Sequence, residues 1–180
     1  MKQLISLLIA LAFFAGAATA EEKEIKYKAG GGLMFGTHVD ELAINLGIYK
    51  TGAEELGFLS FLESFSESAM IGGDINYFLT DSAPGISTSF ITFNFNVLPA
   101  LTVMSDFDIY GIGGINIQRF SVETDFGGFG SFSDSSTDFG INGGAGASKD
   151  IGFADLFGEA KRTLGTESQI VLGGGLRKGF

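Results

Sequence analysis

Hydrophobic and polar residues alternate with a period of two along most of the chain after residue 20. The segment 81–98 shows this pattern most clearly. One of its faces carries Ile91, Phe93, Phe95 and Val97, and the other carries Thr88, Thr92, Asn94 and Asn96. Because successive side chains of a strand point to opposite sides, this alternation predicts β-strands whose two faces meet different environments.

The same period predicts eight strands. They cover residues 24–36, 41–50, 69–79, 81–98, 107–121, 137–148 and 152–164, and the last segment of the chain from about residue 169 to residue 180. A tilted strand crosses a membrane with roughly 9–11 residues, so a chain of this length accommodates eight strands and their connections.

Two segments fit this series less directly. Residues 51–68 suit either a ninth strand or a short amphipathic helix, and we interpret them as a connection because bacterial barrels have even strand numbers. Residues 121–136 are rich in Gly, Ser and Asp. This composition predicts the longest loop of the fold.

The composition of the two strand faces indicates which of them meets water. The polar faces are rich in glycine and poor in charge, whereas the exposed face of a soluble sheet is usually rich in Lys and Glu. The apolar faces carry more large side chains than a small barrel can hold inside. The sequence therefore predicts an all-β fold, an up-and-down antiparallel transmembrane β-barrel of about eight strands. The alternative is a soluble, lipocalin-like ligand-binding barrel.

The first twenty residues have the pattern of a secretory signal peptide. Lys2 gives a positive start, an apolar run covers residues 4–18, and Ala18 and Ala20 are the small residues that a signal peptidase reads. The apolar run is shorter than the roughly 20 residues of a spanning helix. We expect cleavage after Ala20, which leaves residues 21–180 as one barrel domain.

Composition and charge exclude several kinds of chemistry. The net charge is −10, from 11 Lys and Arg against 21 Asp and Glu, so we expect no basic surface for nucleic acid. The chain has no cysteine, which excludes disulfides and thiolate metal sites. It also has no tryptophan, so we expect the aromatic belts of a membrane barrel to be formed by Tyr27, Tyr77, Phe107 and Phe180.

Two small groups of residues raise alternatives that involve chemistry. His38 lies with Thr37 and Asp40 in a predicted tight turn, and some small barrels modify lipid A with a His, a Ser and an acid; the chain lacks a His-x-Ser-Asn pattern. Four acids near the predicted loop suggest a divalent cation site: Glu123, Asp125, Asp134 and Asp138. Runs of acidic residues are more often solvated than bound to a metal. Because neither group has a pattern typical of a catalytic or metal site, we predict no enzyme activity, no metal and no cofactor.

Three glycine-rich motifs follow one another in the second half of the chain. They are Asp108-Ile-Tyr-Gly-Ile-Gly-Gly, Thr137-Asp-Phe-Gly-Ile-Asn-Gly-Gly-Ala-Gly and Leu156-Phe-Gly-Glu-Ala-Lys-Arg, and the chain then ends on Phe180. In this order they resemble strands of the small outer-membrane barrels of the opacity-protein and OmpA/OmpX-like (porin-family) type. Lys178 departs from that family, which usually has an apolar residue third from the end.

The resemblance implies a place in the outer membrane of a Gram-negative bacterium. Its implied partners are outer-membrane lipid, lipopolysaccharide and the outer-membrane assembly machinery, which would read Phe180. An even strand number puts both ends of the chain on the periplasmic side. The working surface is then expected at residues 121–136 and at the turns near 37–40, 80–85 and 163–167, with an extracellular partner that the sequence does not name.

Alternation also predicts which charged residues point into the barrel: Lys26, Lys28, Asp74, Asp108, Glu159, Lys161 and Arg177. Charges of both signs inside a narrow barrel should pair, and we expect Glu159 to be paired with Lys161 or with Arg177. Because an eight-stranded barrel is just wide enough for its own side chains, a plug of paired charges is favoured over the selectivity ring of a small-solute porin. We therefore predict a structural, adhesive or surface-interaction role.

Overall fold

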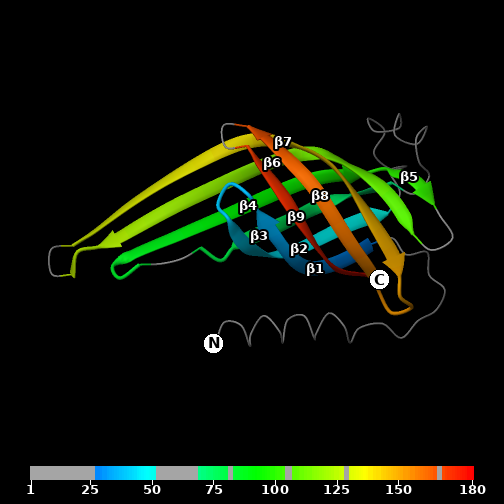
Figure 1. Cartoon of the computed structure of the whole chain (residues 1–180), viewed down its shortest axis with the longest axis horizontal. Coiled ribbons are helices and arrows are strands. Elements are labelled where there is room, and N and C mark those ends of the chain that lie inside the picture. The colour runs from blue at the N-terminus through cyan, green and yellow to red at the C-terminus, as the bar shows by residue number, and fades with distance from the viewer. Residues whose placement is uncertain (1–26, 52–68, 81–82, 104–106, 128–129, 166–167) are drawn as a thin grey trace.

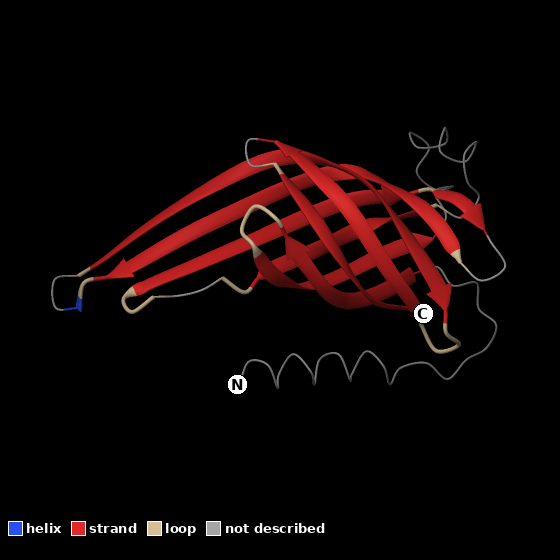
Figure 2. Cartoon of the chain, in the orientation of Figure 1, coloured by secondary structure: helices blue, strands red, loops and turns tan. Residues whose placement is uncertain are grey.

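The computed structural model describes residues 27–51, 69–80, 83–103, 107–127, 130–165 and 168–180. The strands in these ranges are β1 (Tyr27–Gly36), β2 (Glu41–Thr51), β3 (Met70–Phe78), β4 (Ile86–Leu98), β5 (Ala100–Val103), β6 (Asp108–Asp125), β7 (Ser131–Asp150), β8 (Asp155–Gly165) and β9 (Gln169–Gly179) (Figures 1 and 2). The predicted signal peptide, Lys26 and residues 52–68 lie outside the described residues. Within the described ranges, no helix is long and apolar enough to span a membrane.

The strands form one closed antiparallel barrel. Strands that follow each other in the chain pair with each other, except that β4 pairs with β6, and the pairing of β1 with β9 closes the ring. β5 continues the line of β4 beyond Pro99 and pairs with the same neighbour, β6. The nine strands thus form an eight-stranded up-and-down barrel, which confirms the fold class predicted from the alternation.

The two sides of the barrel wall carry opposite kinds of side chain. Large apolar residues face outward and are exposed, among them Leu33, Phe95, Ile115 and Ile141, each more than half exposed. Polar and charged residues face inward and are buried: Asn45, Asp74, Asn76, Thr92, Asn94, Asn96, Asn116, Gln118, Asn142, Glu159, Lys161, Thr163, Gln169 and Arg177. This arrangement is the inverse of a soluble protein, in which apolar residues fill the interior.

The interior is layered along the barrel axis. On β3, Phe78 and Met70 lie towards the two ends of the strand, and Asn76 and Asp74 lie between them. The apolar residues belong to two buried clusters, one of Met34, Ala43, Phe78, Phe90, Phe157 and Val171 and one of Tyr49, Met70, Leu98, Tyr110 and Ile112. The polar residues of β3 therefore lie between two apolar clusters.

The two ends of the barrel differ. One end, here called the hairpin end, carries the β1–β2 turn at residues 37–40, the β3–β4 connection and the turn between β6 and β7. The opposite, terminal end carries the first described residue, Tyr27, and the last, Phe180. The rings of Tyr27 and Phe180 stack with centroids 6.0 Å apart, and the Phe180 N–H donates to the Tyr27 carbonyl at 3.0 Å.

The prediction of a loop at residues 121–136 is wrong for most of that segment. β6 continues to Asp125 and β7 begins at Ser131, and the two strands pair in register up to their tips. β4 pairs with the same stretch of β6 as far as Ile86, opposite Thr124. The resulting three-stranded extension projects beyond the hairpin end (Figure 1). Strand pairing satisfies the backbone whatever the side chains are, so Ser and Asp residues did not prevent it.

Candidate functional site: the polar interior of the barrel

Asp74 on β3 is the centre of the interior hydrogen-bond network. Its Oδ1 accepts from the side-chain amides of Asn45 at 3.2 Å and Asn94 at 2.7 Å, and from the Lys161 ammonium at 3.3 Å. Its Oδ2 accepts from the hydroxyl of Tyr49 at 2.9 Å. Further amide donors reach it from Asn76 and Asn96. A buried carboxylate is costly without partners, and these donors from β2, β3, β4 and β8 supply them.

Asparagine side chains extend this network across the barrel. The Asn94 Oδ1 accepts from Asn116 at 2.7 Å and from Asn142 at 2.8 Å. Asn142 in turn accepts from the Thr163 hydroxyl at 2.9 Å. The network therefore joins strands β4, β6, β7 and β8 through amide groups, which can donate and accept at once.

A second charged group surrounds Arg177 on β9. Its guanidinium forms an ion pair with Glu159 on β8 and donates to the Tyr110 hydroxyl at 3.0 Å. The Tyr110 hydroxyl donates to the same Glu159 carboxylate at 2.9 Å. The guanidinium carbon also lies 3.9 Å from the ring centroid of Phe157 and 4.8 Å from that of Tyr49, within the range of cation–π attraction.

The buried charges balance within the described residues. The acids Asp74 and Glu159 pair with the bases Lys161 and Arg177, and all four residues are less than a tenth exposed. Of the two partners expected for Glu159, the structure pairs it with Arg177, because Lys161 reaches Asp74 instead.

Inward-facing glycines make room for the large polar side chains beside them. A Cβ on Gly146 of β7 would lie 2.5 Å from the Tyr110 ring, and a Cβ on Gly30 of β1 would lie 2.7 Å from the Arg177 Cγ. These two glycines therefore leave the space that the Tyr110–Glu159–Arg177 group occupies.

Replacing Gly146 by Ala is expected to lower the free energy of unfolding by about 1–3 kcal/mol, the usual range for overpacking a filled interior. Tyr110 cannot move aside without loss, because its hydroxyl bonds to both Glu159 and Arg177. Gly143→Ala is the matched control on the same strand, since a Cβ there meets nothing within 4 Å. Urea unfolding in lipid vesicles measures both variants, and equal stabilities would contradict the assigned packing.

Of the remaining charged residues expected inside, Lys28 and Asp108 lie near the terminal end. Lys28 is half-buried and forms an ion pair with Asp155 at 2.6 Å. Asp108 is exposed, contrary to the expectation that it lies inside. It shares the inward-facing parity of Tyr110, but it is the first residue of β6 and lies at the rim. Lys26 falls outside the described residues.

The residues considered for catalysis lie in the β1–β2 turn, and the acids considered for metal binding lie on β6 and β7. His38 lies in the four-residue β1–β2 turn, where Asp40 adopts a positive φ of 56°. Asp125 and Asp134 accept backbone N–H bonds from their own turns or strands. Within the described ranges no group of three or more His, Cys, Asp or Glu residues could hold a metal ion.

The four aromatic residues expected at membrane interfaces are all exposed on the barrel. Tyr27, Phe107 and Phe180 lie at the terminal end, where the Lys149 ammonium also lies 5.1 Å from the Phe107 ring centroid. Tyr77 lies towards the hairpin end of β3. The exposed rings therefore occur at both ends of the barrel.

Sequence reasoning missed the asparagine network. Six buried asparagines take part in the interior of the described structure: Asn45, Asn76, Asn94, Asn96, Asn116 and Asn142. Alternation places several of them on the polar faces, but the bonds join residues up to 48 positions apart among these six. The signal in the sequence that could have identified the network is the recurrence of Asn, rather than Lys or Glu, on the polar faces of successive strands.

Comparisons with known proteins find the fold but no family. No family model matches the sequence, and no curated protein matches it. The crystal structure of Ail, the attachment invasion locus protein of Yersinia pestis, is similar with a TM-score of 0.54 and 13% identity over 84% of this chain and 95% of that chain. The structure of Ail with the heparin analogue sucrose octasulfate gives a TM-score of 0.53 at 13% identity. The chain therefore has the barrel fold of these structures.

Proposed function

We propose that this chain is an integral outer-membrane barrel with a structural, adhesive or surface-interaction role. The observation that carries this proposal is the sidedness of the barrel wall: apolar residues cover the outside, and hydrogen-bonded polar residues fill the inside. Only a closed barrel lets a sheet enter hydrocarbon, because it leaves no backbone edge unpaired. A soluble lipocalin-like barrel needs an apolar pocket, whereas this interior centres on buried charges.

The length of the apolar surface suits a bilayer. On β6 the outward positions from Ile109 to Ile117 hold only Ile or Gly, and the next outward residue is Arg119. This stretch is close to the roughly 9–11 residues with which a tilted strand crosses a membrane. β6 continues from Arg119 to Asp125, so the extension at the hairpin end would project from the membrane into water.

The paired charges support a plug rather than a pore. The Asp74 and Arg177 groups, with the asparagines between strands, occupy the centre of the barrel, and apolar clusters lie on either side of them. A porin needs a continuous wet lumen, which an eight-stranded barrel filled by its own side chains lacks. This filling favours a structural or surface role over solute transport.

The extension supports a surface-interaction role. Residues 131–139 of β7 pair with β6 on one side, and pairing with β8 begins only at Gly140. Within the described residues, this stretch therefore presents a backbone edge on which another molecule can form hydrogen bonds. The similarity in fold to a protein named for attachment and invasion agrees with such a role.

The chain is expected to be heat-modifiable and to reside in the outer membrane. A folded barrel keeps its closed hydrogen-bond ladder in detergent until boiling, so boiled and unboiled samples should migrate differently on a denaturing gel. The measurement uses the outer-membrane fraction after a carbonate wash. Identical mobility together with recovery in the soluble fraction would contradict the proposed function.

A further inference from the structure

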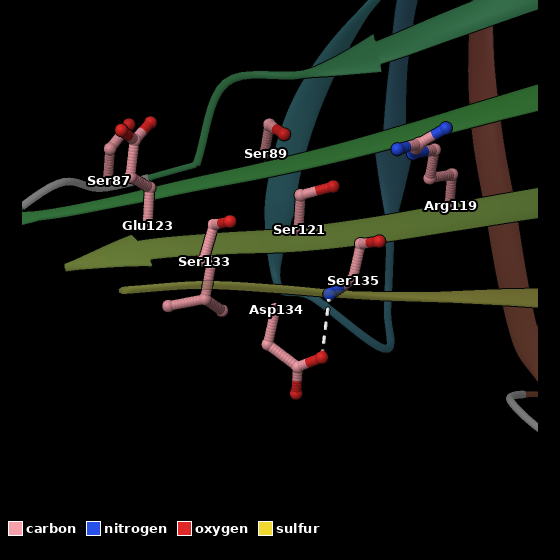
Figure 3. Close-up of a pocket in the computed structure, with 9 residues that line it drawn as sticks. Ser87, Ser89, Arg119, Ser121, Glu123, Ser133, Asp134 and Ser135 are labelled. Atoms are coloured by element: carbon pink, nitrogen blue, oxygen red, sulfur yellow. Dashed lines mark hydrogen bonds between the residues drawn. The ribbon is translucent and has the colours of Figure 1, made fainter. Parts of the chain in front are cut away.

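The three-stranded extension of β4, β6 and β7 has two different faces. The face that continues the barrel's exterior carries hydroxyl and charged side chains: Ser87, Ser89, Arg119, Ser121, Glu123, Ser133 and Ser135. Figure 3 shows these side chains on one side of the sheet and Asp134 pointing to the other side. Serine hydroxyls and charged groups are costly to bury in hydrocarbon, so a face with this composition indicates that the extension lies in water, beyond the apolar part of the barrel.

The opposite face, here called the inner wall, carries apolar side chains among hydroxyl ones. It continues the parity of the barrel interior, and its apolar residues are Ile86, Phe120, Val122 and Phe132, of which Phe132 is 63% exposed and Ile86 42% exposed. Thr88, Thr124 and Ser136 share this face. The Phe120 ring lies 6.4 Å from the ring of buried Phe90. The apolar residues of the inner wall thus continue the cluster that contains Phe90, in the direction away from the terminal end.

Large apolar side chains exposed to water favour contact with a partner. The membrane covers the lipid-facing residues of the barrel. The inner wall, in contrast, belongs to strands whose other face is serine-rich and which project beyond the apolar band. Exposed apolar patches of this kind on a wet surface commonly mark interaction sites.

Acidic residues define the charge of this surface. Asp134 and Asp138 share the inner face of β7, and Glu41 has inward parity at the start of β2. β2 is the strand diametrically opposite β7 in the ring of eight. Within the described residues, the extension has one cationic side chain, Arg119, which belongs to the serine-rich face. The inner wall therefore combines apolar surface with negative charge.

We propose that the inner wall binds a cationic amphipathic peptide segment. Its apolar side chains pack on Phe120, Val122 and Phe132, and its Lys or Arg side chains lie against Asp134, Asp138 and Glu41. Apolar contact provides the affinity, and charge complementarity selects basic over acidic segments. This assignment rests on the proposed function, which places the extension outside the membrane.

The test uses the full chain folded in nanodiscs of zwitterionic phosphatidylcholine, with empty nanodiscs as the background. Fluorescence anisotropy compares three labelled peptides: alternating Lys and Leu, alternating Lys and Ser, and alternating Glu and Leu. The Lys–Leu peptide is expected to bind roughly tenfold or more tightly than either of the others, and added salt should weaken it because screening acts on exposed charges. Equal binding of Lys–Leu and Lys–Ser, or no binding of Lys–Leu, would overturn the proposal.

Variants locate the binding surface. Phe132→Ser is expected to weaken Lys–Leu binding roughly tenfold, and Asp134→Asn combined with Asp138→Asn should weaken it and reduce its salt dependence. Ser133→Ala, the adjacent residue on the opposite face, is the matched control and should bind normally. Equal losses in Ser133→Ala and Phe132→Ser would overturn the assignment to the inner wall. Heat-modifiability verifies that each variant is folded. A heat-modifiable membrane barrel without peptide binding contradicts this inference alone, whereas a chain outside the membrane contradicts the proposed function.

Discussion

Replacing Asp74 by Asn is expected to lower the free energy of unfolding by about 3–5 kcal/mol, the range for breaking one partner of a buried ion pair. The substitution preserves the shape of the side chain but leaves the Lys161 ammonium without its counter-charge, at a position where the Lys161 side chain is 1% exposed. The amide that replaces the carboxylate also has donors of its own, and these face the Asn and Tyr groups that donate to Asp74 in the wild type. Urea unfolding of the barrel in lipid vesicles gives the measurement.

Two comparison variants separate the buried charge from other effects. Asp155→Asn breaks the ion pair with Lys28, whose side chains are 21–23% exposed, so it should cost about 1 kcal/mol or less. Asp74→Asn combined with Lys161→Met removes both charges and should recover much of the stability lost in the single variant. A loss in Asp74→Asn no larger than that in Asp155→Asn would mean that Asp74 is not the centre of the interior hydrogen-bond network.

Removing either partner of the Glu159–Arg177 pair is expected to cost about 3–5 kcal/mol, and removing both should cost much less than the sum. Arg177→Met places an apolar side chain among the rings of Tyr49 and Phe157. Glu159→Gln removes the charge and keeps the side-chain volume. The coupling between the two substitutions arises because each single change leaves a buried charge unpaired. Strict additivity in the double-mutant cycle would mean that the two groups do not meet.

Tyr110 provides a further check on this cycle. Its hydroxyl bonds to both partners, so Tyr110→Phe should lower stability in the wild type more than in the Glu159→Gln, Arg177→Met background. An equal effect in both backgrounds would show that the hydroxyl is not part of the charged group. The comparison needs no new measurement beyond unfolding in vesicles.

The fold was predictable from the sequence because strand alternation is a local property. The period of two places Asp74, Glu159 and Arg177 on polar faces without knowledge of any neighbouring strand. Parity says nothing of depth along the barrel axis, however. Asp108 has the parity of Tyr110 and is nevertheless exposed, because it lies at the first position of β6.

The partners inside the barrel were less predictable, because they depend on the register of strands far apart in the chain. Lys161 and Asp74 are 87 positions apart on β8 and β3, which do not pair with each other. The hairpin at 121–136 was less predictable for a different reason. Its outward positions carry Ser121, Glu123, Ser133 and Ser135 instead of the apolar residues of a membrane strand. The backbone pairing of β6 with β4 and β7 nevertheless continues there.

Quenching by lipid tests most directly whether the barrel's apolar face meets lipid while the extension lies in water. The chain has no tryptophan, so a single Trp reports on one position at a time. Ile115→Trp lies on the outward face of β6 within the apolar band, and Ser133→Trp lies on the corresponding face of the extension. In vesicles of lipids with brominated acyl chains, we expect strong quenching of Trp fluorescence for Ile115→Trp and little for Ser133→Trp. Equal quenching at both positions, or no quenching at position 115, would contradict it.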